Sequence, residues 1–435
     1  MSGASLQRNA VLLVSAAVTL AIVGDWNGAG IFSGLWRLPA AILLLGLAYE
    51  SWSVARSRMA IGLQLPGQLL LGRTIAVNFT CGHALHRRAT IELAPSAPDS
   101  FDIDGGVVSM RVLPGAVAVL ERRLVPRRLG IHAWPPMRAR IAGPLGLAWW
   151  PKKLDLPLQA RVVPDLFHSG TEARGSTPAG TRNGIEVGAG AEVLRLREYR
   201  SGDAPRVIDW KATARAGRLI SRDFAQEHRL EIVIVVDAGR ASSLRSGTLD
   251  RFGHYVNVAA RLAQHAVMQE DLVGLVIYAD RPLATLAPAR GAPAVARLRA
   301  LLAASRVERA ESNPLYAALR VRSLVRQRSL IVLLTDVDDT TVASQLAQAV
   351  RLLLPKHLPF IAALASAAAE STADGPAQAW LDPYRSLAAQ QYCIGLERKV
   401  RALNALGASA LVAKPEQLEA AVFSAYADVR RLKRA

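Results

Sequence analysis

The arrangement of apolar and polar positions divides the chain into four parts, and the first part is strongly apolar. Residues 10–23 and 38–49 are almost wholly apolar, and residues 24–30 between them have the composition of a turn. Each run is shorter than the roughly 20 residues that cross a bilayer comfortably, although residues 31–36 extend the second run. We therefore expect a transmembrane helical hairpin over residues 1–60.

The second part, residues 61–165, alternates apolar and polar positions with the period of two that marks strands. The clearest alternations cover residues 74–80, 89–94, 107–112 and 116–122, with glycine and proline between them. Short strands at such close spacing are typical of a small β-sandwich. We expect a β-sandwich-like domain here.

The last part, residues 230–435, alternates buried strands with amphipathic helices. The expected strands are Ile232–Val236, Leu272–Tyr278, Leu330–Leu334, Phe360–Leu364 and Ala410–Val412, and the expected helices are Phe252–Met268, Pro293–Ala303, Pro314–Leu324, Val342–Leu354, Tyr384–Leu406 and Pro415–Arg431. This alternation predicts the α/β class, with a doubly wound parallel sheet that carries helices on both faces.

Between these parts, residues 166–229 combine a linker with a dense polar motif. Residues 175–184 have the glycine- and serine-rich composition of a flexible linker. Farther on, Asp203 as N-cap, Pro205 in the first turn and Gly217 as C-cap predict a helix from about 204 to 215.

The polar motif itself concentrates opposite charges and two aromatic residues in a short stretch. Its candidate residues are Arg197, Glu198, Tyr199, Gly202, Asp203, Arg206, Asp209, Trp210, Lys211 and Arg215. We expect Asp209 to be buried and paired with a basic neighbour in the motif. Two roles stay open: a structural ion-pair network that fixes the linker to the sheet, or a docking surface for a partner.

Two aspartates close the strands that we expect to lie side by side. Asp237 ends the first strand of the α/β part, and Asp336 follows the strand Leu330–Leu334. Parallel strands bring such residues to the carboxyl edge of a sheet, where open α/β sheets bind their ligands. The layout resembles that of von Willebrand factor A-type domains, whose first strand leads into Asp-x-Ser-x-Ser and a divalent-cation site.

In this chain Gly239 and Ala241 occupy the two serine positions of that motif, and neither side chain can bind a cation. Asp237, Asp336 and Asn313, which stands where the A-type domain has a threonine, remain as oxygen ligands for Mg²⁺. We expect a degenerate metal site and no cofactor, with Mg²⁺ as the ion to test.

Composition adds a basic character to this picture. The chain has 53 Lys and Arg against 35 Asp and Glu, a formal net charge of +18. Such a balance favours an anionic neighbour, namely phospholipid, nucleic acid or an acidic protein surface, unless it reflects genome base composition. No run of five basic residues marks a nucleic-acid-binding arm, so nucleic acid is not the expected partner. The two cysteines, Cys81 and Cys393, suggest no disulfide framework and suit a reducing compartment.

Basic residues also indicate how the hairpin is oriented. Arg8 precedes it, Arg56 and Arg58 follow it, and the turn between the runs carries no basic residue. Because basic flanks stay on the cytoplasmic side, we expect a multi-pass protein of a cell inner membrane with the bulk of the chain in the cytoplasm. A cleaved signal peptide is the alternative, and the sequence lacks the cleavage site that it needs.

The motif Arg197-Glu-Tyr-x-x-Gly-Asp203-x-x-Arg-x-Ile-Asp-Trp-Lys-Ala-Thr-Ala-Arg215 resembles the signature of the bacterial family called domain of unknown function 58 (DUF-58). Arg128-Leu-Gly130 and Gly143-Pro-Leu-Gly-Leu147 are similar to the family's Arg-Gly and Asp-Pro-Phe-Gly-Leu elements, with Gly143 in the place of the aspartate. The order of parts is also that of the family.

This resemblance implies a membrane-anchored scaffold or adaptor that acts with a MoxR-type AAA+ ATPase and other membrane-associated proteins in assembly, maturation or stress tolerance. The sequence carries no serine–histidine–acid order and no cysteine–histidine cluster, so no enzyme is expected. Two other functions stay open: a metal-dependent hydrolase at the sheet edge, and a basic binder of anionic lipid or nucleic acid. The oligomeric state stays open as well.

Overall fold

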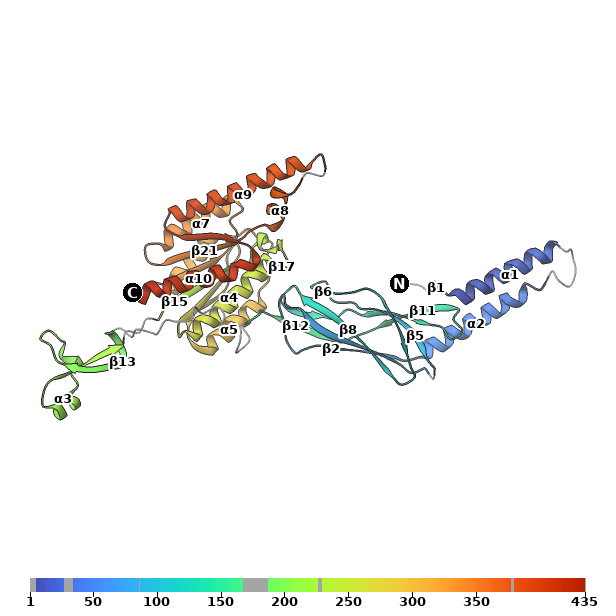
Figure 1. Ribbon diagram of the computed structural model, residues 1–435, viewed down its shortest axis with the longest axis horizontal. Coiled ribbons are helices and arrows are strands. Elements are labelled where there is room, and N and C mark those ends of the chain that lie inside the picture. The colour runs from blue at the N-terminus through green and yellow to red at the C-terminus, as the bar shows by residue number, and fades with distance from the viewer. Residues whose placement is uncertain are drawn as a thin grey trace. The chain divides into compact units, whose positions relative to one another are not determined.

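The structure is a computed structural model that describes residues 5–26, 34–85, 87–166, 187–225, 229–376 and 379–434. The chain forms two compact units, Met1–Pro164 and Asp165–Ala435 (Figure 1). Helices and several β-sheets occur together, which confirms the mixed α/β class.

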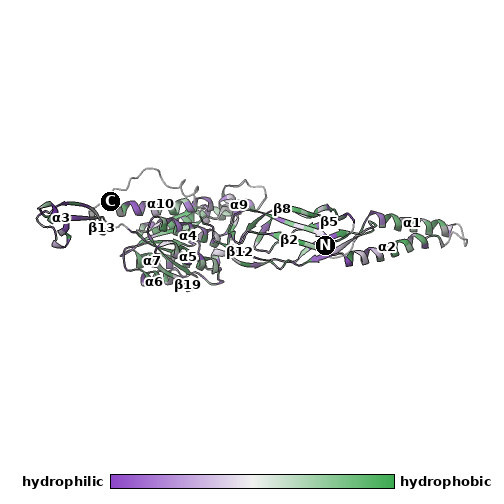
Figure 2. Cartoon of the chain, turned by 90° about the horizontal axis from the view of Figure 1, so that it is seen from below, coloured by the Kyte–Doolittle hydropathy of each residue, from purple (hydrophilic) through white to green (hydrophobic). Residues whose placement is uncertain are grey.

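The first unit begins with two apolar helices, α1 (Arg8–Trp26) and α2 (Arg37–Arg56). Of the described residues, only α2 forms a helix long and apolar enough to cross a membrane, and the apolar helical stretch Arg8–Val23 is shorter. Large apolar side chains such as Leu38, Leu44 and Leu45 are exposed on α2, and Figure 2 shows the hydrophobic colour along both helices. The transmembrane hairpin stays a prediction.

The rest of the first unit consists of three sheets of short strands. The five-stranded sheet has the order β1 (Ser5–Leu6), β11 (Ala148–Leu154), β10 (Met137–Ala142), β5 (Ala89–Ala94) and β7 (Val108–Val112). The four-stranded sheet has the order β2 (Met59–Gln64), β4 (Ile75–His83), β8 (Val117–Pro126) and β6 (Phe101–Ile103), and the three-stranded sheet the order β3 (Leu69–Leu70), β12 (Gln159–Val163) and β9 (Gly130–Ala133). Alternate residues of β4, β5 and β10 are buried, as the period-two pattern predicts.

A buried carboxylate joins α2 to the β part of this unit. Glu50 is 0% exposed. Its Oε1 accepts hydrogen bonds from the backbone N–H groups of Leu145 (2.7 Å) and Leu147 (3.0 Å). Its Oε2 accepts from the N–H of Ala148 (3.0 Å) and from Trp150 Nε1 (3.2 Å). The carboxylate therefore satisfies the donors of the turn that opens at Gly143.

The absence of a side chain at Gly143 is what makes this contact possible. A Cβ at that position would lie 2.0 Å from Oε2 of Glu50. This is the position where the resemblance leads us to expect an aspartate. The carboxylate is thus present at this turn, but α2 supplies it from 93 residues earlier in the chain.

The second unit contains a six-stranded sheet with the order β19 (Pro282–Ala289), β18 (Leu272–Tyr278), β15 (Glu231–Asp237), β20 (Leu330–Leu334), β21 (Leu358–Leu364) and β22 (Ser409–Ala413). All neighbours are parallel except β18 and β19. The sequence pattern did not predict β19. This strand begins with a proline, carries another, and has no fully buried position, as befits an edge strand.

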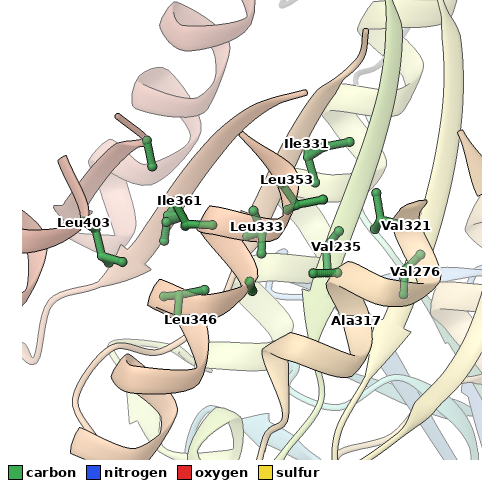
Figure 3. Close-up of a cluster of buried hydrophobic side chains, with 14 of the residues drawn as sticks. Val235, Val276, Ala317, Val321, Ile331, Leu333, Leu346, Leu353, Ile361 and Leu403 are labelled. Atoms are coloured by element: carbon green, nitrogen blue, oxygen red, sulfur yellow. The ribbon is translucent and has the colours of Figure 1, made fainter. Parts of the chain in front are cut away.

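Helices pack against both faces of this sheet, so its central strands are buried on both sides. The helices of the unit are α4 (Arg251–Met268), α5 (Gly291–Ala304), α6 (Pro314–Leu324), α7 (Thr340–Leu353), α8 (Ala367–Asp374), α9 (Asp382–Ala405) and α10 (Pro415–Arg434). Figure 3 shows one face, where Val235, Leu333 and Ile361 pack with side chains of α6, α7 and α9. The alternate strand residues Ile232, Ile234 and Val236 are also buried, on the face that α4 contacts.

Residues 187–225 form a separate β-hairpin with a helical insertion. Strand β13 (Val187–Glu198) pairs antiparallel with β14 (Ile220–Ala225), and the 3₁₀ turn η2 (Pro205–Val207) and helix α3 (Trp210–Ala216) lie between them. Residues 175–184, the expected linker, lie outside the described residues. The short elements that follow β15 are η3 (Arg240–Ser243), β16 (Arg245–Ser246) and β17 (Leu249–Asp250).

The prediction of a helix from about 204 to 215 is wrong at its start. Asp203 is not the N-cap, because its carboxylate is engaged by Arg197. Asp209 caps α3 instead, by accepting from the N–H groups of Lys211 and Ala212. Gly217 is the C-cap, with a φ of 65° that favours glycine.

Candidate functional site

The carboxyl edge of the six-stranded sheet brings the two predicted aspartates to neighbouring strands. Strands β15 and β20 are adjacent and parallel, so Asp237 at the end of β15 and Asp336 just after β20 lie at the same edge. From β15 the chain continues to β18 on one side, and β20 lies on the other. This is a topological switch point, where open α/β sheets form their ligand crevice.

Asp237 is fully buried and is held by neutral donors. Its Oδ1 accepts from Gly239 N (2.8 Å) and Ser312 Oγ (2.5 Å), and its Oδ2 accepts from Thr335 Oγ1 (2.7 Å) and Tyr278 OH (3.4 Å). A carboxylate offers about four acceptor positions. Three of them receive short hydrogen bonds, and the Tyr278 hydroxyl, which also donates to Thr335 Oγ1 at 2.9 Å, lies near the fourth. Burial raises the pKa of Asp237 and outweighs these hydrogen bonds, which lower it.

Gly239 has a packing role that the sequence did not reveal. A Cβ there would lie 2.1 Å from Ser312 Oγ and 3.1 Å from Asp237 Oδ1. Ser312 thus takes the space that a side chain at 239 would need, and it supplies the hydroxyl to Asp237. Ala241 lies in η3, where its methyl group offers no ligand.

Asp336 is paired with a buried arginine that the sequence reading missed. Arg251 is the first residue of α4, and its side chain is 4% exposed. Its Nη1 forms an ion pair with Asp336 Oδ2, and its Nη2 lies 2.8 Å from Asp338 Oδ2. One guanidinium therefore bridges two carboxylates at the edge where the resemblance predicts a divalent cation. The position of Arg251 in the sequence could have indicated this burial, because Arg251 precedes the buried Tyr255 and Ala259 at the four-residue spacing of one helix face.

Asn313, the third predicted metal ligand, serves as the N-cap of α6. Its Oδ1 accepts from Tyr316 N at 3.3 Å. Among the described residues, no group of three or more His, Cys, Asp or Glu side chains is arranged to hold a metal ion. The donor set does not fit Mg²⁺, which demands near-octahedral oxygen coordination, because neutral donors surround Asp237 and a guanidinium lies against Asp336.

A cavity of about 420 Å³ lies at the ends of β21 and β22, next to the ion pairs of Arg251. Tyr392, Leu396 and Val412 are among its lining residues, and Lys414 pairs with Glu370 (3.0 Å) at its wall. Burial raises the pKa of the Tyr392 hydroxyl, and Asp338 beside it raises that pKa further. The Tyr392 side chain therefore connects the cavity to the ion pairs that Arg251 forms with Asp336 and Asp338.

The polar motif forms an internally satisfied ion-pair frame on the hairpin. Arg197 binds Asp203 with two hydrogen bonds (2.7 and 2.8 Å) and Asp223 with a third (2.9 Å). Arg195 also binds Asp223 (2.8 Å), and Ser221 Oγ donates to Asp203 (3.1 Å). The hydrogen bonds from Arg197 hold the pKa of Asp203 well below its usual range.

The remaining motif residues divide between this frame and the surface. Tyr199 donates its hydroxyl hydrogen to the backbone oxygen of Asp203 (3.2 Å), and Gly202 has a φ of 107°, which favours glycine. Glu198 pairs with Arg218 in an exposed position. The other exposed charged or aromatic side chains of the motif are those of Arg206, Trp210, Lys211 and Arg215. The motif therefore combines a structural frame with an exposed surface.

Asp209 differs from the prediction in its partner. It was expected to be buried beside Arg206, Lys211 or Arg215, but it is only partly buried, and its Oδ2 lies 3.1 Å from Arg222 Nε. Its Oδ1 accepts from the N–H groups of Lys211 (3.0 Å) and Ala212 (2.9 Å). The hydrogen bond from Ala212 is the largest cause that lowers its pKa.

We predict that Asp209→Ala loosens the hairpin more than Arg200→Ala. Asp209 both caps α3 and pairs with Arg222, so its loss leaves two helix N–H groups without an acceptor and a guanidinium without its ion-pair partner. The exposed Arg200 side chain has no partner among the described residues. Hydrogen exchange of the α3 and β14 amides in the full-length chain measures the effect. Equal exchange in both variants would contradict the structural role of Asp209.

Comparison with known proteins finds one family and distant structural likenesses. The family described as "Protein of unknown function DUF58" matches residues 195–364. This match confirms the predicted resemblance over that range, and it assigns no activity. The comparison with proteins of curated function found no match.

Solved structures resemble parts of the chain at low sequence identity. The native alpha-2-macroglobulin of Escherichia coli, from domain MG7 to its C-terminus, is 15% identical over 25% of this chain and 17% of that one (TM-score 0.20). The conserved hypothetical protein BatB of Bacteroides thetaiotaomicron is 15% identical over 31% of this chain and 66% of that one (TM-score 0.26). The FixG-related protein of Vibrio parahaemolyticus is 12% identical over 23% of this chain and 97% of that one (TM-score 0.16).

Proposed function

We propose that the protein is a membrane-anchored, cytoplasm-facing scaffold whose α/β unit is a metal-independent binding module of the von Willebrand factor A type. It acts with a MoxR-type AAA+ ATPase in the assembly or maturation of other proteins or in stress tolerance. The observation that carries this proposal is the Arg251 guanidinium, which bridges Asp336 and Asp338 at the switch point of the sheet. The ligand edge of the module is thereby ordered by protein groups alone.

Two further observations support the architecture in this proposal. When the six strands are numbered by their order in the chain, they lie across the sheet in the order 3-2-1-4-5-6. The third strand, β19, is antiparallel and lies at the edge. This order places the ends of β15 and β20 at the ligand edge. For the anchor, the support is α2, whose length and composition suit a membrane span, together with the basic residues Arg56 and Arg58 at its C-terminal end.

The hydrolase alternative is disfavoured by the same guanidinium. Metal-assisted hydrolysis needs a cation with a coordination position open to water. Arg251 offers only N–H donors, and it engages the carboxylates that would hold such a cation. Asp237 is likewise surrounded by hydroxyl and N–H donors rather than open to solvent. A binding role needs neither a metal-bound water nor a free carboxylate.

Co-purification from membranes tests the proposal. The full-length chain with a tag after Ala435 is extracted in a mild detergent, once with Mg²⁺ and a non-hydrolysable ATP analogue and once without nucleotide, and its companions are identified by mass spectrometry. We expect an AAA+ ATPase to be enriched over a control membrane protein with the same tag. If no AAA+ ATPase is enriched in either condition, the proposed partnership is wrong.

A further inference from the structure

The hairpin has an excess of positive charge that its own carboxylates do not neutralise. Residues 195–225 contain eight basic and four acidic residues. Each of the four carboxylates is paired with an arginine: Glu198 with Arg218, Asp203 with Arg197, Asp209 with Arg222, and Asp223 with Arg195 and Arg197. No carboxylate of this segment is left for the other cations.

Four exposed cations therefore have no carboxylate partner among the described residues. They are the side chains of Arg200, Arg206, Lys211 and Arg215. Two of them lie on α3, whose first residue is Trp210, and the Trp210 side chain is 65% exposed. Leu196 and Leu219 of the same hairpin are exposed as well. We call Arg206, Trp210, Lys211 and Arg215 the hairpin surface.

Hydrogen bonds and ion pairs within the hairpin connect the segments that carry the hairpin surface. Arg197 connects Asp203, between the strands, to Asp223 on β14, and Asp209 ties the start of α3 to Arg222. The N–H of Asp209 donates to the backbone oxygen of Ile220 at 2.8 Å. Preorganisation of this kind lowers the entropy cost of a specific contact.

The chemistry of the hairpin surface selects its partner. Tryptophan and arginine are the residues that most often dominate protein–protein binding energy. Guanidinium groups bind carboxylates through two parallel hydrogen bonds. A lipid surface attracts cations without requiring a fixed spacing, whereas the frame connects the backbone segments that carry these side chains. Charge complementarity and these connections together favour an acidic protein surface with an apolar recess for Trp210.

We propose that the hairpin surface docks an acidic surface of a protein partner, with Trp210 as the apolar anchor. The proposal rests on the proposed function, because the partner is taken to be the ATPase recovered there. The frame residues Arg197, Asp203 and Asp223 hold the surface in place and do not contact the partner.

The test measures binding of that purified ATPase to the full-length chain in nanodiscs of phosphatidylcholine. One variant combines Arg206→Glu, Lys211→Glu and Arg215→Glu, and a second is Trp210→Ala. The matched control combines Arg297→Glu, Arg309→Glu and Arg326→Glu, three exposed arginines of the α/β unit that change the net charge by the same amount. We expect the reversal variant to bind about 30-fold more weakly or worse, Trp210→Ala about 10-fold more weakly, and the control unchanged.

A carbodiimide, which joins an amine directly to a carboxylate, reads out the predicted chemistry. Wild type should form a crosslink between Lys211 and an acidic residue of the ATPase, and Lys211→Arg should bind equally well but form no such crosslink. Unchanged thermal unfolding of each variant shows that the frame persists.

The outcomes separate this proposal from the one on which it rests. If wild type and the reversal variant bind the ATPase equally, the docking proposal is wrong and the partnership stands. If wild type itself does not bind, both are wrong. If the reversal variant loses affinity only when the nanodiscs contain phosphatidylglycerol, the surface binds anionic lipid, and the protein-docking proposal is overturned.

Discussion

Glu50→Ala is expected to destabilise the first unit strongly, although the residue lies on an apolar helix. Its carboxylate accepts hydrogen bonds from three backbone N–H groups and from the Trp150 indole. Removing it leaves several buried donors unsatisfied, at about 1–3 kcal/mol each, so a total loss of about 3 kcal/mol or more is expected. Thermal unfolding of the full-length chain in detergent measures it. The matched control is Glu121→Ala, which removes an exposed carboxylate from β8 of the same unit.

A compensating pair tests whether the carboxylate at this turn can come from either position. Gly143→Asp alone should be destabilising, because its Cβ would lie 2.0 Å from Glu50 Oε2. With Glu50→Ala the same aspartate has room, so the double variant should be more stable than the sum of the single losses predicts. Strictly additive losses would show that an aspartate at 143 cannot reach the donors that Glu50 serves.

Arg251→Ala is expected to cost the second unit about 3–5 kcal/mol, the usual loss when one partner of a buried ion pair is removed. The change leaves Asp336 buried beside Asp338 without a cation. Arg251→Lys should be intermediate, because an ammonium group lacks the fork that contacts both carboxylates. Urea unfolding of the full-length chain measures both, with Arg297→Ala as an exposed control.

Divalent cations should distinguish these variants further. Wild type should show little change in melting temperature with millimolar Mg²⁺ or Ca²⁺. Arg251→Ala should be partly restored, because a cation can then neutralise Asp336 and Asp338. Binding at 100 times the dissociation constant stabilises by about 2.7 kcal/mol, which is well within detection. A clear Mg²⁺ stabilisation of wild type that disappears in Asp237→Ala would contradict a metal-independent module.

The local sequence pattern was sufficient to predict the bounds of elements whose signals lie within a few residues. The predicted bounds of Leu272–Tyr278, Leu330–Leu334 and Pro314–Leu324 agree with the structure residue for residue. The two strands are continuous apolar runs, because both faces of the sheet are covered. The helix has Asn313 as N-cap and Pro314 in its first turn. Strand β19 was missed because an edge strand with prolines lacks such a run.

The helix around residue 204 illustrates a local signal that a more distant one overrides. Asp203, followed by Ala and Pro205, has the sequence of a helix start. In the structure Arg197 and Ser221 donate hydrogen bonds to its carboxylate. Ser221 lies on β14, the second strand of the hairpin. Asp209 then caps the helix. Capping preference is worth about 1 kcal/mol, which a charge-assisted pair with two hydrogen bonds can exceed.

Sequence alone was enough to place Asp237 and Asp336 at one edge of a parallel sheet, because strand direction and alternation are local properties. It also identified Gly239 and Gly143 as departures from the motifs that they resemble. Only the tertiary structure decided what fills those positions: Ser312 beside Gly239, Glu50 beside Gly143, and Arg251 against Asp336. Each of these contacts joins residues more than 70 positions apart in the chain. Packing selects such a partner through space and charge, and no spacing rule along the chain encodes it.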